Sequence, residues 1–569
     1  MKNPEKNNIH DTFDGSIRFT APVYQRYYVW KQEELQALLD DIENAADNES
    51  IQFIGATVVQ DFGKKGGTSS PNEYLIIDGQ QRLTTIYLLI AGLANCYLGS
   101  NREEDAMVLI ETYLSYGTSK YKGVPKLLPT IQDRKQLFDL LEEHLPSIEW
   151  TYGDDIGDET SKKDGIKNQW KNIINHFQDT FFNDEGNLLE SKIEQFQENL
   201  LNNIELIQIT LEPKDDANTA FSKLNYEGVT LSLSDLVRND VFSRLENRKE
   251  SLESFYKQNW KPFEKSFPNK SFEQYIAIYS TIKFKGKFAK SRAFPELQKS
   301  WSKTAPEDII IEMKSYSDIY CSLVNYVDVK GFHKDVNKCI RRFSFMPKTT
   351  VTWPYILELL HAFRQQSISK KNVVDCMAIV ESFLVRRAIA GLEPTGLHAV
   401  FKSLWGKAGP DPKKLKEKIV TATIRCPNNE QLREDLKVES MYSRQITKYL
   451  LIQREIKYNE KHGYDNALND FSIEHVLPKN LTGEWATLFT KEEHRLCLNT
   501  IGNLIPLTKG QNSKIKDDDW DKKKLSLKGS NWKLTQKLSS KSVWNRSTID
   551  QLTDDFIDWA CTEWPDITP

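Results

Sequence analysis

The feature that most constrains the fold is an ordered set of polar residues near the carboxyl end of the chain. Glu474 and His475 end a short apolar stretch that begins at Phe471, and a second apolar stretch begins at Asn503 after a long polar segment. A polar segment that contains Asn512 follows directly. Short apolar stretches bounded by turn residues indicate strands. The sequence therefore predicts a strand, a long loop, a second strand and a polar helix, in that order.

These residue types suit the hydrolysis of a phosphodiester. The imidazole of His475 can take a proton from water near neutral pH, which makes it a candidate general base. Mg²⁺ or Mn²⁺ prefers oxygen ligands, and the Glu474 carboxylate and the Asn512 side-chain carbonyl could supply them beside the base. Asn503 could hold the imidazole in its productive orientation. The alternative is a packed histidine surrounded by turn-forming asparagines. Two further candidates are Asn499 and Lys514.

The same residues resemble a known family. The sequence Glu-His-Val-Leu-Pro at 474–478, the Asn-x-x-Gly-Asn-Leu box at 499–504 and the asparagine nine residues after Asn503 resemble the HNH domain of GmrD-type restriction subunits. The Asn-to-Asn spacing is also similar to the HNH domain of CRISPR effector nucleases. The resemblance implies a ββα-metal nuclease, with His475 as general base, Asn503 as orienting residue, and Glu474 and Asn512 as metal ligands. Glu474 stands where many HNH enzymes have aspartate.

A second polar cluster lies where a predicted strand turns into a helix. Residues 51–60 and 74–77 are strand-like and flank the glycine- and lysine-containing loop 62–72, which predicts a hairpin. The second strand leads into Asp-Gly-Gln-Gln-Arg at 78–82, and a helix is expected from about Leu83. Such a junction offers free backbone N–H groups and the positive end of a helix to a phosphate.

Several side chains at this junction could contact a nucleotide. Gly79 would let the backbone approach closely, Arg82 could pair with phosphate oxygens, and Asp78 could take a metal ion or a water molecule. Upstream, Gln25 and Arg26 lie among aromatic residues that could frame a base and a phosphate, or form the edge of a core. The sequence contains no Walker A loop.

This part of the chain also resembles a known domain. The sequences Pro-x-Tyr-Gln-Arg-x-Tyr-x-Trp at 22–30, Asp-Gly-Gln-Gln-Arg-Leu-Thr-Thr at 78–85 and the box at 220–232 together resemble the GmrS-type domain, which is similar to ParB-superfamily nucleotide-binding folds. The resemblance implies binding and hydrolysis of a nucleoside triphosphate whose identity stays open. The implied site comprises Asp78, Gln80, Gln81 and Arg82, assisted by Gln25 and Arg26. In the third box, Asn225 and Gly228 would form another wall of the site or a structural turn.

The length of 569 residues is too great for one core, so we expect an α+β protein of several domains. We predict a ParB-like α/β nucleotide-binding domain at 1–245 with a helical insertion at about 100–200. A helical middle domain at 246–430 and a GmrD-like HNH domain at 431–569, set among helices, would follow. Further expected elements are helices at 33–46, 218–226, 234–245 and 442–458, a polar loop at 153–164 and a strand at 204–211.

Composition limits the partners and the compartment. A formal charge of −4 gives no chain-wide attraction to nucleic acid, so contacts with DNA must come from local basic patches. The seven cysteines are scattered without metal-finger spacing, which indicates reduced thiols. The amino-terminal residues are polar, unlike a secretory signal. The apolar stretch 86–98 is too short to span a bilayer, so we expect it to be a buried helix. We therefore expect a cytoplasmic protein with no membrane association.

A GmrS-like part followed by a GmrD-like part implies a single-chain type IV restriction enzyme. The expected function is nucleotide-dependent cleavage of modified double-stranded DNA in defence against phage. One alternative is an HNH nuclease whose ParB-like domain only binds DNA, and another is a non-catalytic accessory protein of a defence system. No residue discriminates glucosylated or methylated cytosine from a phosphorothioate backbone. Oligomeric state, including a homo-oligomer, also stays open.

Overall fold

The computed structural model describes residues 4–23, 25–48, 51–64, 70–117, 121–152, 165–212, 232–245, 252–268, 271–392, 394–458, 471–515 and 518–568. The chain divides into two compact units, Met1–Lys261 and Pro262–Pro569. The α+β class is confirmed, whereas the three predicted domains stay a prediction. The expected helix at 218–226 and the polar loop at 153–164 lie outside the described residues, as do Asn225 and Gly228.

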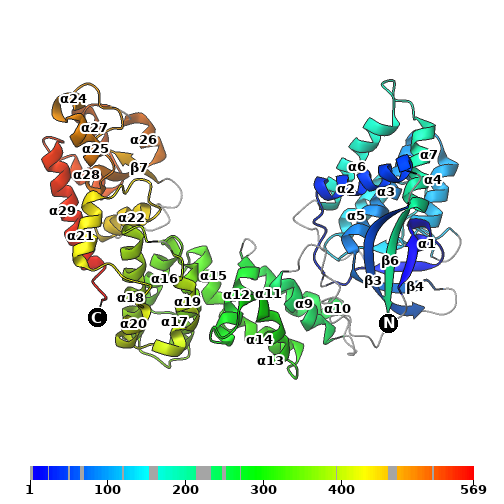
Figure 1. Ribbon diagram of the computed structural model, residues 1–569, viewed down its shortest axis with the longest axis horizontal. Coiled ribbons are helices and arrows are strands. Elements are labelled where there is room, and N and C mark those ends of the chain that lie inside the picture. The colour runs from blue at the N-terminus through cyan, green and yellow to red at the C-terminus, as the bar shows by residue number, and fades with distance from the viewer. Residues whose placement is uncertain are drawn as a thin grey trace. The chain divides into compact units, whose positions relative to one another are not determined.

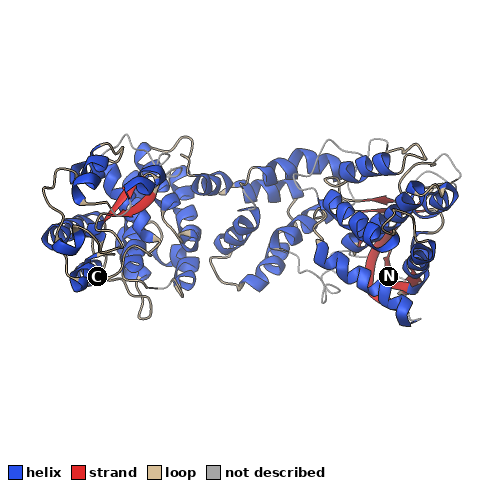
Figure 2. Cartoon of the chain, turned by 90° about the horizontal axis from the view of Figure 1, so that it is seen from above, coloured by secondary structure: helices blue, strands red, loops and turns tan. Residues whose placement is uncertain are grey.

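A mixed six-stranded sheet forms the centre of the first unit (Figure 1, Figure 2). Its strand order is β1-β6-β3-β4-β2-β5. The strands are β1 (Glu5–Asn8), β2 (Ile17–Thr20), β3 (Gln52–Lys64), β4 (Asn72–Asp78), β5 (Leu127–Leu128) and β6 (Ile204–Leu211). The antiparallel pairing of β3 with β4 confirms the predicted hairpin, and β6 has the predicted bounds. β1, β2 and β5 were not expected, because strands this short carry no clear alternating pattern.

Alternating residues of β3 and β4 divide between the two faces of the sheet. Val59 and Ile76 belong to the large core that the helices cover, whereas Val58 and Ile77 belong to a smaller cluster with residues of β6. This division follows from the two-residue period of a strand. The sheet is therefore apolar on both faces, and apolar residues pack against both faces of β4 up to its end at Asp78.

Helix α3 (Gln80–Gly99) is the main element of the large core. It begins directly after β4, and every residue from 83 to 94 is buried. A helix that is apolar on all sides is buried on all sides, which confirms the buried helix expected at 86–98. The other helices of this unit are α1 (Ile9–Phe13), α2 (Gln32–Asn48), α4 (Glu103–Leu109), η1 (Ile110–Leu114), α5 (Arg134–His144), α6 (Gly165–Phe181), α7 (Glu190–Glu198), η3 (Asn199–Asn203), α9 (Leu233–Ser243), α10 (Leu252–Phe255) and η4 (Tyr256–Trp260).

The second unit is built mainly of helices, as the sequence predicted for its first part. Its helices up to residue 458 are α11 (Lys261–Lys265), α12 (Ser271–Lys283), η5 (Lys290–Arg292), α13 (Ala293–Ser300), α14 (Pro306–Lys314), α15 (Ser317–Asn325), α16 (Lys334–Phe345), η6 (Thr350–Thr352), α17 (Trp353–Arg364), α18 (Lys370–Ile389), α19 (Leu397–Ala408), α20 (Pro412–Ile419), α21 (Asn429–Val438) and α22 (Ile446–Tyr458). Within the described part of both units, no helix combines the length and the hydropathy needed to cross a membrane.

Two short strands and a further set of helices complete the second unit. These elements are β7 (Ser472–His475), α24 (Trp485–Leu488), α25 (Lys491–Cys497), η7 (Ile501–Asn503), β8 (Leu504–Leu507), α26 (Lys509–Ile515), α27 (Trp520–Lys528), α28 (Lys533–Leu538) and α29 (Arg546–Glu563). The segment between the two strands was predicted as a loop, but it contains α24 and α25. The prediction missed them because α24 has only four residues and α25 only seven.

The carboxyl-terminal tail after α29 is held by α18. Glu381, in the middle of α18 and 5 % exposed, accepts a hydrogen bond from Trp564 Nε1 at 2.7 Å. Arg386 Nε donates to the Trp564 carbonyl at 2.9 Å, and Ser382 Oγ donates to the Pro565 carbonyl at 2.6 Å. We call these contacts the tail clasp. They join residues 381–386 of the helical region to the end of the chain inside one compact unit.

Candidate functional site

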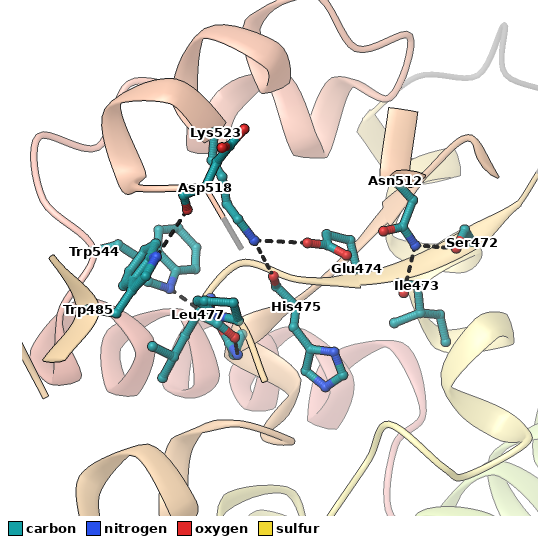
Figure 3. A network of polar contacts seen from close by, with 12 residues as sticks. Ser472, Ile473, Glu474, His475, Leu477, Trp485, Asn512, Asp518, Lys523 and Trp544 are labelled. Atoms are coloured by element: carbon teal, nitrogen blue, oxygen red, sulfur yellow. Dashed lines mark hydrogen bonds and ion pairs between the residues drawn. The ribbon is translucent and has the colours of Figure 1, made fainter. Parts of the chain in front are cut away.

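Strands β7 and β8 pair antiparallel, and α26 packs against β7. The register places His475 opposite Leu504 and Glu474 opposite Ile505. Asn512, on α26, donates from Nδ2 to Ser472 Oγ and to the Ile473 carbonyl. The predicted order of strand, strand and helix is confirmed, and it gathers Glu474, His475 and Asn512 around one strand (Figure 3). That the arrangement is an HNH fold stays a prediction.

His475 is held by an asparagine and an aromatic ring. Its Nε2 donates to Asn499 Oδ1 at 2.9 Å, and its ring lies 4.1 Å from the ring of Tyr442, measured between centroids. The backbone N–H of Met441, the residue before Tyr442, donates to the Asn499 carbonyl at 2.9 Å. Asn499 therefore positions both the His475 ring and the segment that carries Tyr442. Because an amide oxygen only accepts hydrogen bonds, Nε2 carries the hydrogen and Nδ1 keeps its lone pair. Nδ1 is therefore the atom that can take a proton.

The imidazole of His475 is neutral at physiological pH. Burial, with the residue only 4 % exposed, lowers its pKa to about 4. The hydrogen bond with Asn499 opposes this shift, whereas the nearby ammonium groups of Lys479 and Lys523 add to it. The ring is thus kept in the form that accepts a proton, at the cost of a weaker base.

A pH profile of DNA cleavage tests this assignment. We expect a constant cleavage rate from neutral pH down to about pH 5, followed by a tenfold fall per unit below a midpoint near the His475 pKa of about 4. The sign follows from the low pKa, because only the neutral ring accepts a proton and protonation begins only in acid. Intrinsic fluorescence at each pH checks that the protein stays folded. A midpoint near the ordinary histidine value of 6.5 would contradict the burial of the ring.

Asn503 does not hold the imidazole as the sequence predicted. Its Oδ1 accepts from the Leu477 backbone N–H at 2.7 Å and from Trp544 Nε1 at 3.2 Å. Its Nδ2 donates to the carbonyls of Leu477 at 3.1 Å and Leu498 at 2.8 Å. An asparagine side chain has no further capacity for hydrogen bonds once it makes four. Asn503 therefore fixes the backbone that follows His475, and Asn499 makes the contact with the ring.

Glu474 is paired with a buried lysine. Lys523, on α27, has no exposed side-chain surface and donates from Nζ to Glu474 Oε1 and to the His475 carbonyl, both at 2.9 Å. One ammonium group thus holds both members of the acid–histidine pair (Figure 3). The side chains of adjacent strand residues point to opposite faces, so the Glu474 carboxylate and the His475 ring lie on different faces of β7. The candidate metal ligand and the candidate base are thus on different faces of the strand, and the binding of a metal ion stays a prediction.

The donor set around Glu474 still suits a hydrated divalent ion. Asn512 lies on the Glu474 face of β7, because it bonds to Ser472 two residues earlier on the same strand. Its Oδ1 makes no hydrogen bond with any described residue, and in Figure 3 it points toward Glu474. One carboxylate and one amide oxygen fit Mg²⁺, which keeps several of its waters in proteins. Among the described residues, no group of three or more histidine, cysteine, aspartate or glutamate side chains is placed to hold a metal.

Sequence reasoning missed two residues of this site and ranked a third too low. Tyr442 lies before the motif and carries no signal in the sequence. Lys523 is the middle residue of a lysine run that reads as an exposed or phosphate-binding face, yet it points inward. Asn499 was only a secondary candidate, although it is part of the quoted box. Lys514 lies in α26, and its side chain is outside the described set.

The Asp-Gly-Gln-Gln-Arg motif lies between β4 and α3, as predicted. Gly79 caps α3 with a φ of +91°, and a Cβ atom there would lie 2.6 Å from Thr57 Cγ2 on β3. A side chain at this position would therefore be both strained and obstructed. Gly79 has no side chain that could hydrogen-bond to the first backbone N–H groups of α3. The positive end of this 20-residue helix therefore has no side-chain cap and lies at the motif. This geometry agrees with the predicted phosphate-binding junction.

The three glutamines of the predicted nucleotide site act as backbone ties. Gln80 Nε2 donates to the Arg26 carbonyl at 2.7 Å, and Gln81 Oε1 accepts from the Val29 backbone N–H at 2.7 Å. Gln25 Nε2 donates to the carbonyls of residues 76 and 77 in β4, at 2.7 and 3.0 Å. The structure therefore brings the 25–30 segment against the start of α3. The side-chain amides of these glutamines are hydrogen-bonded to backbone groups of the protein.

The charged residues of the motif lie together near β3. Arg82 Nη1 donates to the Ala56 carbonyl at 2.9 Å, and its guanidinium packs against Gly55, whose φ of +104° and missing side chain leave room for it. Burial lowers the pKa of Arg82 and raises that of Asp78, and each charge partly offsets the shift of the other. Arg26 also acts on Asp78, lowering its pKa. The predicted residues are thus gathered at one end of β4, and their role in nucleotide binding stays a prediction.

Both ends of the chain match known family models. The model of the GmrSD restriction endonuclease N-terminal domain matches residues 9–242, and that of the C-terminal domain matches residues 426–559. The two matches together define a restriction endonuclease of type IV with a two-domain architecture. The chain belongs to the GmrSD restriction endonuclease family. No match to it was found among the curated proteins.

Proposed function

We propose that this restriction endonuclease cuts modified foreign DNA at the His475 site, under the control of a nucleoside triphosphate bound at the amino-terminal motif. The observation that carries the nuclease assignment is the neutral imidazole with a free Nδ1, held by Asn499 on the strand that also carries Glu474 and contacts Asn512. The family membership supports the reaction class. The substrate, its modification and the nucleotide are part of the proposal.

In the cleavage step, His475 Nδ1 takes a proton from a water molecule and the resulting hydroxide attacks the phosphorus. The bond from phosphorus to one sugar oxygen breaks, and that leaving oxygen takes a proton from solvent. Asn499 holds Nε2–H throughout, so the ring keeps its orientation and spreads the positive charge that it gains. In the described structure Tyr442 covers one face of the ring. The substrate must therefore approach Nδ1 from the ring edge or displace that aromatic side chain.

Glu474 and Asn512 would hold a divalent metal ion, Mg²⁺ or Mn²⁺, through one carboxylate and one amide oxygen. Such an ion, when bound, stabilises negative charge on the phosphate oxygens. Lys523 donates to the Glu474 carboxylate and to the His475 carbonyl, so one ammonium group holds both residues in place.

At the amino-terminal motif, the positive end of α3 and the guanidinium groups of Arg82 and Arg26 would bind the triphosphate. Asp78 lies beside both arginines and is positioned to orient a water molecule or a metal ion. Gln25, Gln80 and Gln81 support this site by fixing the backbone around it. Hydrolysis of the bound triphosphate at this motif would be required before modified DNA is cut at His475, so cleavage would depend on the nucleotide.

A phage challenge panel that differs only in DNA modification tests the proposal, with wild type beside Arg82→Ala and Arg82→Lys. We expect wild type to restrict one class of modified phage and to spare the unmodified one. Arg82→Ala should lower nucleotide turnover about 10- to 100-fold, the effect of one lost charge-assisted hydrogen bond, and abolish restriction. Arg82→Lys keeps the charge and should lose less.

The outcomes separate the rival functions. Normal DNA cleavage by Arg82→Ala, with no nucleotide turnover by wild type, would favour an amino-terminal domain that only binds DNA. Absence of nicking by wild type on every plasmid in the presence of Mg²⁺ would favour a non-catalytic accessory protein. Arg102→Ala is the matched control, because this arginine is paired with Asp105 and Glu194 outside the motif and should leave turnover unchanged.

A further inference from the structure

A cavity of about 310 Å³ in the second unit is lined by three basic side chains, Lys348, Arg387 and Arg444. Arg387 is 6 % exposed, and its Nη1 donates to the Arg425 carbonyl at 2.6 Å. Arg444 is ion-paired with Glu439, which does not itself line the cavity. Glu393, between two lining residues in the sequence, lies outside the described part of the chain. The described cavity thus has an excess of positive charge in a chain whose net charge is negative.

Backbone features add to the positive potential of this cavity. The first residues of two helices line it, Leu397 of α19 and Ile446 of α22, and both helices are long enough to carry a positive amino end. The carboxyl end of α18 also reaches the cavity, but its carbonyls are used by its own chain. The backbone N–H of Leu392 donates to the Arg387 carbonyl at 2.9 Å, and that of Gly391 donates to the Ala388 carbonyl at 3.3 Å.

The absence of a side chain at Gly391 lets one basic group into the cavity. This residue has a φ of +67°, and a Cβ atom there would lie 2.4 Å from Arg444 Nη1. The guanidinium of Arg444 therefore occupies the space that any other residue would fill. Arginine presents several N–H donors in a planar fork, which suits the oxygens of a phosphate.

The cavity is next to the candidate base along the chain. Tyr442, whose ring packs on His475, is followed directly by the lining residues 443–446. Residues 442–446 span at most roughly 14 Å even when fully extended. A DNA strand carries a phosphate for about every 3.4 Å of helix axis, so one strand can reach both places. Lys479, whose Nζ lies 4.8 Å from the centre of the Tyr442 ring, adds a positive charge near the candidate base.

We propose that this cavity binds a backbone phosphate of the DNA strand that is cut at His475, a few nucleotides from the scissile phosphate. The inference rests on the proposed nuclease function and names a second contact with its substrate. The contact is independent of base sequence and of base modification, because phosphates carry neither. It supplies the local basic patch that a chain with a negative net charge requires.

The test measures binding of a short unmodified DNA duplex by the full-length protein, made inactive by His475→Ala, between about 50 and 200 mM salt. Lys348→Gln and Arg444→Gln, added singly, should each weaken binding roughly eightfold at 0.1 M salt and make the slope of log K against log salt shallower by about 0.9. The double variant should lose no more than about 0.9 of slope in total, because the cavity binds one phosphate. Arg444→Lys should restore most of the binding.

Lys416→Gln is the matched control, because this exposed lysine on α20 is outside the cavity. Unchanged affinity and salt slope in the two cavity variants, with thermal melts equal to the parent, would overturn the proposal. Loss of nucleotide turnover without loss of DNA binding would also overturn it, since the occupant would then be a free nucleotide. Failure of the nuclease function is seen separately, as cleavage by His475→Ala or no cleavage by the active parent.

Discussion

His475→Ala will lower DNA cleavage by about 10²- to 10⁴-fold, the usual contribution of a general base, while the protein folds normally and still turns over nucleotide. The imidazole is the group near Glu474 and Asn512 whose Nδ1 is free to take a proton at neutral pH. Alanine removes that atom and leaves the strand pairing of β7 with β8 intact, because the pairing uses backbone groups. Plasmid nicking with Mg²⁺ and nucleotide hydrolysis, measured on the same preparation, check both parts.

His494→Ala is the matched control for this experiment. His494 lies on α25 near the site and makes a 2.8 Å hydrogen bond with the Pro478 carbonyl, but it contacts neither Glu474 nor Asn512. We expect its replacement to change cleavage by only a few-fold. Equal losses in the two variants would show that a general disturbance of the loop, rather than loss of a base, explains the effect. Loss of nucleotide turnover in His475→Ala would contradict the division of labour between the two ends of the chain.

Lys523→Met will destabilise the second unit by about 3–5 kcal/mol, the usual cost of breaking a buried ion pair. The side chain of Lys523 is fully buried and that of Glu474 is 11 % exposed, so solvent cannot replace the lost ammonium group. Methionine fills a similar volume but leaves the Glu474 carboxylate and the His475 carbonyl without this donor. Urea unfolding followed by tryptophan fluorescence measures the loss, because Trp485, Trp520 and Trp544 lie in the surrounding core.

Lys522→Met on the same helix provides the comparison. This side chain is 66 % exposed and pairs with Asp519, so its loss should change stability by less than about 0.5 kcal/mol. If the two methionine variants unfold at the same urea concentration, Lys523 is not the buried partner of Glu474. If Lys523→Met is stable but needs a different metal concentration for cleavage, its main effect is on the Glu474 carboxylate rather than on folding.

The sequence predicted the elements of both sites where local pattern decides structure. The hairpin before Asp78, the start of the buried helix α3 and the strand that ends in His475 are all local features, and each is present. The uncapped positive end of α3 also follows from Gly79 and its neighbours.

The contacts that decide the role of each polar residue could not be predicted, because they depend on distant parts of the chain. Asn499 and Asn503 are four residues apart and chemically identical, yet one bonds to the imidazole and the other to backbone. The choice is made by η7, which turns Asn503 inward toward Trp544, a residue 41 positions later. Lys523 reaches Glu474 across 49 positions, and its burial depends on how α27 packs.

The tail clasp bears on which segment of the chain keeps its internal contacts when it is exchanged between related proteins. The matched family segment ends at residue 559, but the chain continues to Trp564, whose indole and carbonyl are bound by Glu381 and Arg386 of α18. A gene fragment limited to the segment 426–559 would encode neither half of this contact, so a graft of it onto a foreign helical region would lack both the tail and the acid and arginine of α18 that hold it. An exchange of this segment between relatives would therefore retain the tail clasp only if it included both α18 and the residues up to Pro565.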